Sequence, residues 1–209
     1  MAKMPNGILG PFVGSIGPVV GSSWKGIPYQ KSKYKKRKKN ITQTEQGNRD
    51  KFGEGQRWLQ PITGFVRTGF RGYKGKIEGF IAAKSYLSHY AWEGTGADRR
   101  INPALMKVSV GTLPLSNDMA VEKVAEGLRF SWSTEPVPGA SRFDQVMMLA
   151  YDIENGKGYF ITTGQLRSTG ADLLAMQPGK GSTVHVYMAF NGFDRTSQSD
   201  SVYMGTITF

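Results

Sequence analysis

The side chains most often used in catalysis are scarce in this 209-residue chain. It has no cysteine, which excludes disulfides, thiolate chemistry and cysteine-ligated metals. It has two histidines, His89 and His185, and neither stands in a metal-ligand spacing such as H-x-x-H or H-E-x-x-H. His185 alternates with apolar residues, as a side chain packed in a strand does, and His89 falls on a predicted helix. We therefore expect neither histidine to be catalytic.

Two other short patterns are too incomplete to indicate catalysis. GKGST at 179–183 has the glycines and lysine of a phosphate-binding loop, but it lacks the full spacing and precedes a strand pattern. Asp152 and Glu154 flank the predicted hairpin ENGKG (154–158), where we expect both to face solvent. The sequence thus predicts a protein that is not an enzyme and needs no cofactor, bound metal or small-molecule substrate.

Positive charge is concentrated in the first part of the chain. Residues 1–90 hold 17 Lys and Arg against 4 Asp and Glu, whereas residues 91–209 hold 10 against 12. The densest run is IPYQKSKYKKRKK (27–39), which as a strand would place cations about 6.6 Å apart on one face. Such a ladder could follow a nucleic-acid backbone without reading its bases, or it could simply be solvated and keep a strand edge from pairing. The candidate polyanion-binding residues, with the tyrosines available for stacking, are Tyr29, Lys31, Lys33, Tyr34, Lys35, Lys36, Arg37, Lys38 and Lys39.

An apolar repeat precedes the basic run. In GPFVGSIGPVVGSS (10–23), Gly, Pro, Val, Gly and Ser recur after seven residues, and the prolines and glycines exclude a helix. Prolines confine such segments to sheet edges or strand starts, where apolar side chains need a partner. That partner could be the rest of the same chain, as in an ordinary hairpin, or a second subunit. The candidate subunit-contact residues are Phe12, Val13, Val19, Val20 and Trp24.

The remainder of the chain divides into a helical region and a β region. Thr42 and Glu45 have the spacing of a capping box at a helix start, and Pro61 ends that helix. Apolar residues at helical spacing predict further short helices over 62–70 and 77–91. After the linker GTGADRRINP, residues 104–209 contain eight short runs at the spacing of a β-sandwich, namely LMKVSVG, VEKVAEG, LRFSWS, DQVMMLAYD, GYFITTG, ADLLAM, STVHVYMAF and SVYMGTITF. We therefore predict an N-terminal arm and basic strand (1–41), a short helical region (42–93) and a β-sandwich domain (104–209).

The predicted fold class is mainly β with a small helical region (α+β), ending in an antiparallel β-sandwich of about seven strands. The side chains of Phe130, Trp132, Val184 and Val186 are expected in its core. A buried tryptophan on an early strand and Tyr187 on the penultimate strand are typical of a fibronectin type III or immunoglobulin-like sandwich.

Nearly the full length of the chain resembles an uncharacterised domain-of-unknown-function family of similarly sized proteins from Bacteroidota. The matching elements are NGILGPFVGSIGPVVGSSWKGIPY, the helix start at 42–45 with Arg49 and Phe52, and the later stretches LRFSW and VHVYMAF. A Gly-rich hairpin followed by a basic strand and such a helix is also similar, more distantly, to small proteins encoded in phage-like regions. The family resemblance implies no activity.

These features predict a non-enzymatic structural, self-assembling protein, such as a subunit of a filament, a particle or a phage-like structure. Its N-terminal strand or arm would make the contacts between subunits. The alternative is a protein that binds nucleic acid or another polyanion, without regard to sequence, through its basic N-terminal half. The glycines and prolines of residues 4–24 do not fit a signal peptide or a membrane span, so the cytoplasm is the default location, with a virion or particle, or non-classical export, also open.

Overall fold

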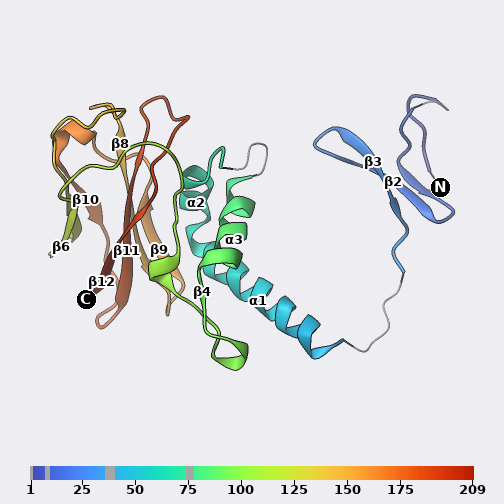
Figure 1. Cartoon of the computed structure of the whole chain (residues 1–209), viewed down its shortest axis with the longest axis horizontal. Coiled ribbons are helices and arrows are strands. Elements are labelled where there is room, and N and C mark those ends of the chain that lie inside the picture. The colour runs from blue at the N-terminus through green and yellow to red at the C-terminus, as the bar shows by residue number, and fades with distance from the viewer. Residues whose placement is uncertain (1, 8–9, 36–40, 74–77) are drawn as a thin grey trace. The chain divides into compact units, whose positions relative to one another are not determined.

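The chain forms two compact units, Met1–Gln46 and Gly47–Phe209, which we call the N-terminal unit and the main unit. The computed structural model describes residues 2–7, 10–35, 41–73 and 78–209 (Figure 1). Each unit has its own sheets.

Three antiparallel strands make up the sheet of the N-terminal unit. In order across the sheet they are β1 (Gly14–Ile16), β2 (Val19–Trp24) and β3 (Ile27–Ser32). Gly17 and Pro18 connect the first pair, and Gly17 has a φ of 55°. Lys25 and Gly26 connect the second pair with φ angles of 50° and 81°, the double positive φ of a type I′ hairpin turn. The apolar repeat is therefore extended and turns at its glycines, as the sequence predicts.

Three helices begin the main part of the fold. The first, α1 (Gln43–Leu59), is capped as predicted, because the backbone N–H of Glu45 donates to Thr42 Oγ1 at 3.3 Å. A 3₁₀ turn, η1 (Gln60–Ile62), contains Pro61 and leads into α2 (Thr63–Gly69). The last helix is α3 (Gly79–Tyr90). It approaches α2 so closely that a Cβ at Gly79 would lie 2.6 Å from the Arg67 carbonyl oxygen, so only glycine fits at this crossing.

A short irregular segment joins the helices to the sheets. It contains a two-stranded ribbon, β4 (Trp92–Glu93) with β5 (Arg100–Ile101), and the 3₁₀ turns η2 (Gly96–Asp98) and η3 (Pro103–Leu105). The run LMKVSVG (105–111) was expected to form a strand but does not. Its backbone makes hydrogen bonds to a side chain that is distant in the sequence. The N–H groups of Val108 and Ser109 both donate to Ser201 Oγ, at 2.9 and 3.3 Å.

Seven strands in two antiparallel sheets form the rest of the main unit. The three-stranded sheet has the order β10-β7-β6, and the four-stranded sheet has the order β12-β11-β8-β9. A 3₁₀ turn, η4 (Arg167–Thr169), precedes β10. The strands are β6 (Ala120–Val124), β7 (Gly127–Ser131), β8 (Gln145–Asp152), β9 (Lys157–Ile161), β10 (Ala171–Ala175), β11 (Thr183–Asn191) and β12 (Val202–Thr208).

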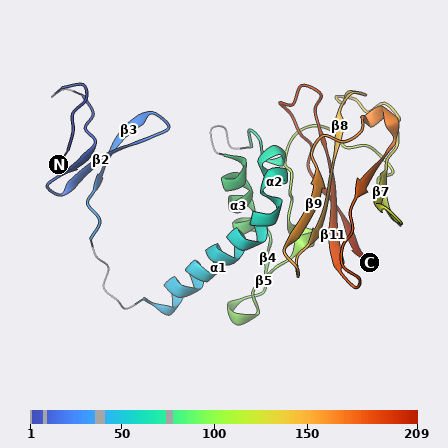
Figure 2. The ribbon, with the colours of Figure 1, turned by 180° about the vertical axis from the view of Figure 1, so that it is seen from behind.

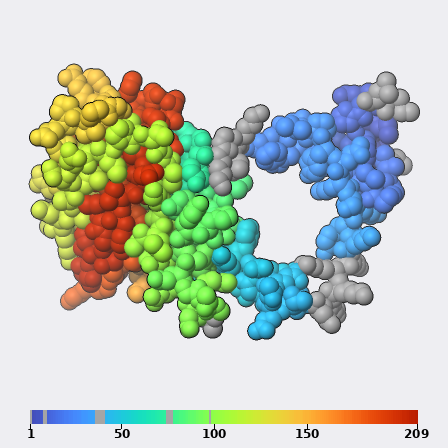
Figure 3. All heavy atoms as spheres, in the orientation of Figure 1, coloured from blue at the N-terminus to red at the C-terminus, as the bar shows by residue number. Residues whose placement is uncertain are grey.

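The four-stranded sheet is the middle of three layers. One face packs on the three-stranded sheet and the other on the helices, as both ribbon views show (Figures 1 and 2). Strand β8 is therefore buried on both sides: Met148 faces the three-stranded sheet, whereas Met147 and Leu149 face the helices. Strand β12 lies at the sheet edge, and the C-terminal residues (red) are visible on the surface in the space-filling view (Figure 3).

The predicted mixed α+β fold with a C-terminal antiparallel sandwich is confirmed. Phe130, Trp132, Val184 and Val186 all lie in the core between the two sheets. The Trp132 indole N–H donates to the Arg167 carbonyl at 2.7 Å. Tyr187 faces the helix side and donates its O–H to the Pro103 carbonyl at 2.8 Å. The likeness to fibronectin type III or immunoglobulin domains stays a prediction.

Candidate interaction surfaces

The N-terminal sheet has almost no core of its own. Among the described residues of this unit, Gly21 alone is buried. It is covered by Phe12, since a Cβ at position 21 would lie 2.7 Å from Phe12 Cδ2. A sheet needs burial of an apolar face to be stable by itself. The N-terminal unit therefore leaves most of its apolar side chains available to a partner.

The predicted subunit-contact residues differ in how exposed their side chains are. Phe12, Val19 and Val20 are half-buried within the small sheet. Val13 and Trp24 are 55% and 58% exposed. Sequence reasoning missed two neighbours of the same kind, Ile16 and Ile27, which are also exposed. Strand alternation around the Lys25–Gly26 turn was the signal that could have found Ile27, because residues opposite each other in a hairpin share a face.

One face of the sheet combines aromatic rings with cations. Trp24 pairs with Ile27, and Ser22 pairs with Tyr29, so these side chains share a face with Lys31. Lys31 Nζ lies 5.8 Å from the centre of the Tyr29 ring, and Lys25 Nζ lies 5.1 Å from that of Trp24. A hydrogen bond with Ser22 and the nearby Lys31 charge lower the pKa of Tyr29. The face is thus aromatic and positively charged.

The basic strand is shorter than the sequence predicts. Strand β3 ends at Ser32, and one further backbone bond, from Lys33 N–H to the Pro18 carbonyl at 2.7 Å, extends the pairing. Tyr34 and Lys35 follow outside the strand and are exposed. The predicted positions Lys36, Arg37, Lys38 and Lys39 lie outside the described residues. Tyr29 and Lys31 therefore alternate along one face of β3 as predicted, and Lys33 follows at the same spacing just after the strand ends.

Of the residues considered for catalysis, His89 lies on a helix, whereas His185 pairs with Tyr151 beside Asp152 and is close enough to Glu154 for that charge to affect its pKa. His89 is exposed on α3, and its Nδ1 is 2.6 Å from the Ser85 carbonyl oxygen. His185 lies on β11, where its Nδ1 is 2.9 Å from the Tyr203 hydroxyl and burial lowers its pKa. Asp152, expected in solvent, is buried, because it accepts the backbone N–H and side-chain amide of Asn155. Within the described ranges no three His, Cys, Asp or Glu residues gather as metal ligands would.

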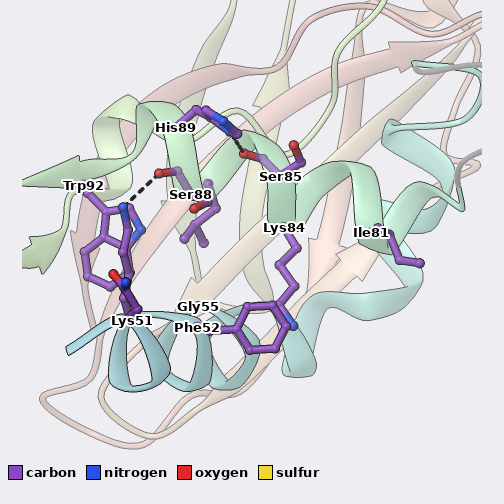
Figure 4. A pocket seen from close by; sticks show the side chains of 11 residues that line it. Lys51, Phe52, Gly55, Ile81, Lys84, Ser85, Ser88, His89 and Trp92 are labelled. Carbon is purple, nitrogen blue, oxygen red and sulfur yellow. Dashed lines mark hydrogen bonds between the residues drawn. The ribbon is translucent and has the colours of Figure 1, made fainter. Parts of the chain in front are cut away.

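A groove between α1 and α3 is the main surface feature that sequence reasoning missed. It encloses about 460 Å³ and lies entirely within the main unit (Figure 4). Gly55 and Leu87 are buried residues of its lining, and a Cβ at position 55 would lie 3.1 Å from Leu87 Cδ2. Phe52 and Ile81 line it and remain 65% and 53% exposed. The α1 positions Asn48, Lys51, Phe52 and Gly55 follow i, i+3, i+4, i+7 spacing, which was the available signal.

Lysines accompany this apolar groove. Lys51 Nζ donates to the Ser88 carbonyl at 3.1 Å and lies 5.4 Å from the centre of the Trp92 ring. Lys84 Nζ donates to Gln56 Oε1 at 2.5 Å and lies over the Phe52 ring. Burial lowers the pKa of Lys84. No described carboxylate lies within ion-pair distance of either ammonium group.

The helices of the described ranges are all too short or too polar to cross a membrane. No curated protein and no solved structure matches the chain. A family model does match, over residues 11–205, which include the apolar repeat, the helices and both sheets of the main unit. The chain therefore belongs to the family of unknown function DUF6266.

Proposed function

We propose that this chain is a non-enzymatic, self-assembling structural protein whose N-terminal sheet makes the contact between subunits. A single observation carries the proposal: the sheet has three ordered strands, yet Gly21 is its only buried residue among those described. Apolar side chains such as Trp24, Ile27 and Val13 are exposed. A subunit of a filament, particle or phage-like structure would use such an arm.

Burial of the exposed side chains of this sheet would favour assembly. Full burial of one Val, Ile or Phe side chain is worth roughly 1.5–3 kcal/mol. Trp24, Ile27 and Val13 are each more than half exposed, so burial of all three against a neighbour would contribute several kcal/mol per contact. Part of this offsets the loss of translational and rotational freedom on association. In an assembly the same contact is repeated on every subunit, so its contribution is repeated as well.

Light scattering coupled to size-exclusion chromatography tests this proposal. The full chain is expected to be oligomeric at both low and high salt, because an apolar contact survives screening. Deletion of residues 1–41, which keeps the Thr42 cap of α1, should give a folded monomer. The double variant Trp24→Ser with Ile27→Ser should also dissociate, whereas Phe193→Ser, which removes an equally exposed ring of the main unit, should not. A monomeric full chain, or a truncated chain that still assembles, would refute the proposal.

A second candidate function is binding of single-stranded nucleic acid without sequence preference. The observation that favours it is the aromatic and cationic face with Trp24, Tyr29 and Lys31. In the sequence, Tyr34 and a run of cations up to 39 follow this strand. Bases stack on exposed aromatic rings at about 1–3 kcal/mol each, and lysines neutralise phosphates.

Fluorescence anisotropy with a labelled oligothymidine separates the two functions. Replacing the cations at 35–39 with Gln should weaken binding and flatten its salt dependence, by about 0.7 in the log–log slope for each lost phosphate contact. Tyr29→Ser should weaken binding without changing that slope. Equal binding by these variants and the unaltered chain would eliminate the second candidate.

A further inference from the structure

We propose that a second pocket of the main unit binds a uronate, which is a six-membered sugar ring that carries one carboxylate. Residues 71–73, 110–112 and 196–198 line this pocket, and it encloses about 420 Å³, a volume within the range of small-molecule sites. The loop after α2 and the loop between β11 and β12 contribute to it, and both lie at the same end of the main unit in the two ribbon views (Figures 1 and 2). The pocket belongs to the main unit alone, so the proposal is independent of the N-terminal sheet and of the proposed assembly.

The side chain of Gln198 joins the three lining segments. It is 5% exposed, and its Nε2 donates to the carbonyl oxygens of Arg71 and Val110 at 2.6 and 3.0 Å. These two bonds identify the nitrogen of the amide, because only the NH₂ group can donate to a carbonyl oxygen. The amide oxygen Oε1 therefore points away from both backbone acceptors.

This amide oxygen is an acceptor that the protein does not use. Gln198 Oε1 receives no hydrogen bond from the described residues, although the side chain is almost completely buried. It is also not one of the inaccessible polar atoms without a partner, which in the described ranges are Trp92 Nε1, Arg99 Nε and Arg167 Nε. Oε1 is therefore accessible, at the pocket that Gln198 lines. Such an acceptor suits a ligand that can donate a hydrogen bond, as a hydroxyl does.

Arg71 gives the pocket a positive charge. Its Nη1 donates to the Arg195 carbonyl, and no carboxylate in the described part of the chain lies within ion-pair distance of its guanidinium. Two described carboxylates lie beside the lining, and each already has a partner. Asp200 pairs with Lys107 at 2.5 Å, and Asp194 accepts the backbone N–H two residues further along the chain at 2.9 Å. Because a guanidinium presents a planar fork of donors that matches a carboxylate, Arg71 favours an anionic ligand.

The rest of the lining suits a sugar ring. The Thr112 and Ser197 hydroxyls have no hydrogen-bond partner among the described residues, and Tyr73 and Val110 add apolar surface beside them. Apolar walls with a few polar groups are typical of small-molecule sites.

The two unused groups of the pocket together select the ligand. A simple carboxylate has only acceptors when ionised, so it would leave Gln198 Oε1 without a donor. A neutral sugar would supply hydroxyl donors but would leave Arg71 without a counter-charge. A uronate carries both hydroxyls and a carboxylate on one ring, so it matches both groups.

Saturation-transfer NMR with the methyl glycosides of glucuronate and galacturonate tests the proposal on the full chain. These two sugars differ in the configuration of one ring hydroxyl, and we expect at least one to bind with a Kd of about 1 mM, as suits a ligand of this size. Methyl glucoside lacks the charge and propionate lacks the hydroxyls, so each should bind about tenfold more weakly. The method detects the bound sugar whether the protein is monomeric or assembled, so failure of the proposed assembly would not affect the result.

Three variants locate the site. Arg71→Met should weaken uronate binding about tenfold and remove the preference for the uronate over methyl glucoside. Arg142→Met, a matched exposed arginine on a loop outside the pocket, should change neither. Thr112→Tyr fills the pocket and should abolish binding with an unchanged circular dichroism spectrum, since Thr112 is exposed. Absence of binding by both uronates, equal binding of methyl glucoside or propionate, or unchanged uronate affinity in Arg71→Met would overturn the proposal.

Discussion

Replacement of Arg167 by Met is expected to be among the most destabilising single changes in the main unit. Arg167 and Asp144 are 4% and 1% exposed, and Arg167 Nε lies 3.5 Å from Asp144 Oδ2. That contact is electrostatic, because Nε makes no hydrogen bond. The other guanidinium nitrogens donate to Ser116 Oγ and the Pro114 carbonyl, both at 2.7 Å, and Arg167 Cζ lies 4.0 Å from the centre of the Phe190 ring. One side chain thus joins the loop at Pro114 and Ser116 and the loop at Asp144 to the core.

The expected loss of stability follows from the buried groups that the substitution leaves without partners. Arg167→Met keeps most of the apolar volume, but it leaves the buried Asp144 carboxylate without its cation and two further acceptors without donors. Breaking a buried pair in this way costs about 3–5 kcal/mol. For a unit of this size each kcal/mol lowers Tm by about 2–4 °C, so we expect a fall in Tm of about 6–20 °C.

Urea unfolding followed by circular dichroism measures this loss directly. The double variant with Asp144→Asn should recover part of it, because no uncompensated charge then remains. Lys107→Met provides the control: its pair with Asp200 is at 2.5 Å but partly exposed, so its loss should cost no more than about 1 kcal/mol. A loss below about 1 kcal/mol in Arg167→Met would refute the reasoning from burial.

Three more predictions test the fold. Trp132→Ala should cost about 3–5 kcal/mol in urea unfolding, as a large core truncation between the two sheets. Burial lowers the pKa of His185 below its ordinary value of 6.5. As the pH falls, the imidazole therefore becomes protonated in the unfolded chain before it does in the folded one, and the free energy of unfolding should decrease below about pH 6.5. His185→Gln should lose that part of the pH dependence, and His89→Gln, an exposed control, should retain it. Residues 104–209 alone should aggregate in light scattering, because removal of the helices exposes Met147, Leu149 and the rest of the helix-facing side of the sheet.

The local pattern of the sequence was sufficient to predict most elements. The helix cap at Thr42, the helical stripes and seven of the eight expected strand runs are found in the structure. The run at 105–111 alternates like a strand but is held by Ser201, which is about ninety residues away. The prediction that Asp152 faces solvent was wrong for a local reason. The backbone N–H and side-chain amide of Asn155 both donate to the Asp152 carboxylate, so this group can be buried.

The layer arrangement was less predictable. The apolar run VMMLAY (146–151) is continuous rather than alternating, which is typical of a strand covered on both faces. Only the structure shows that the second cover is the helices. The groove at Phe52 escaped prediction for a related reason, since it is lined by residues of both α1 and α3, which meet at Gly55 and Leu87. The pattern of a single helix does not show which helix packs beside it.

The register of the N-terminal sheet shows how the two copies of the seven-residue repeat are arranged. Its two copies form adjacent strands, and the equivalent glycines, Gly14 and Gly21, lie directly opposite each other. At Gly21 the missing side chain lets Phe12 lie against the sheet, which accounts for the one buried position among the described residues of this unit. The repeat therefore covers one small part of the sheet and leaves Trp24 and Ile27 exposed at the opposite hairpin. In the main unit, by contrast, the middle sheet is covered on both faces. The N-terminal strands carry apolar side chains that their own unit does not bury, and this is the observation that supports the proposed contact between subunits.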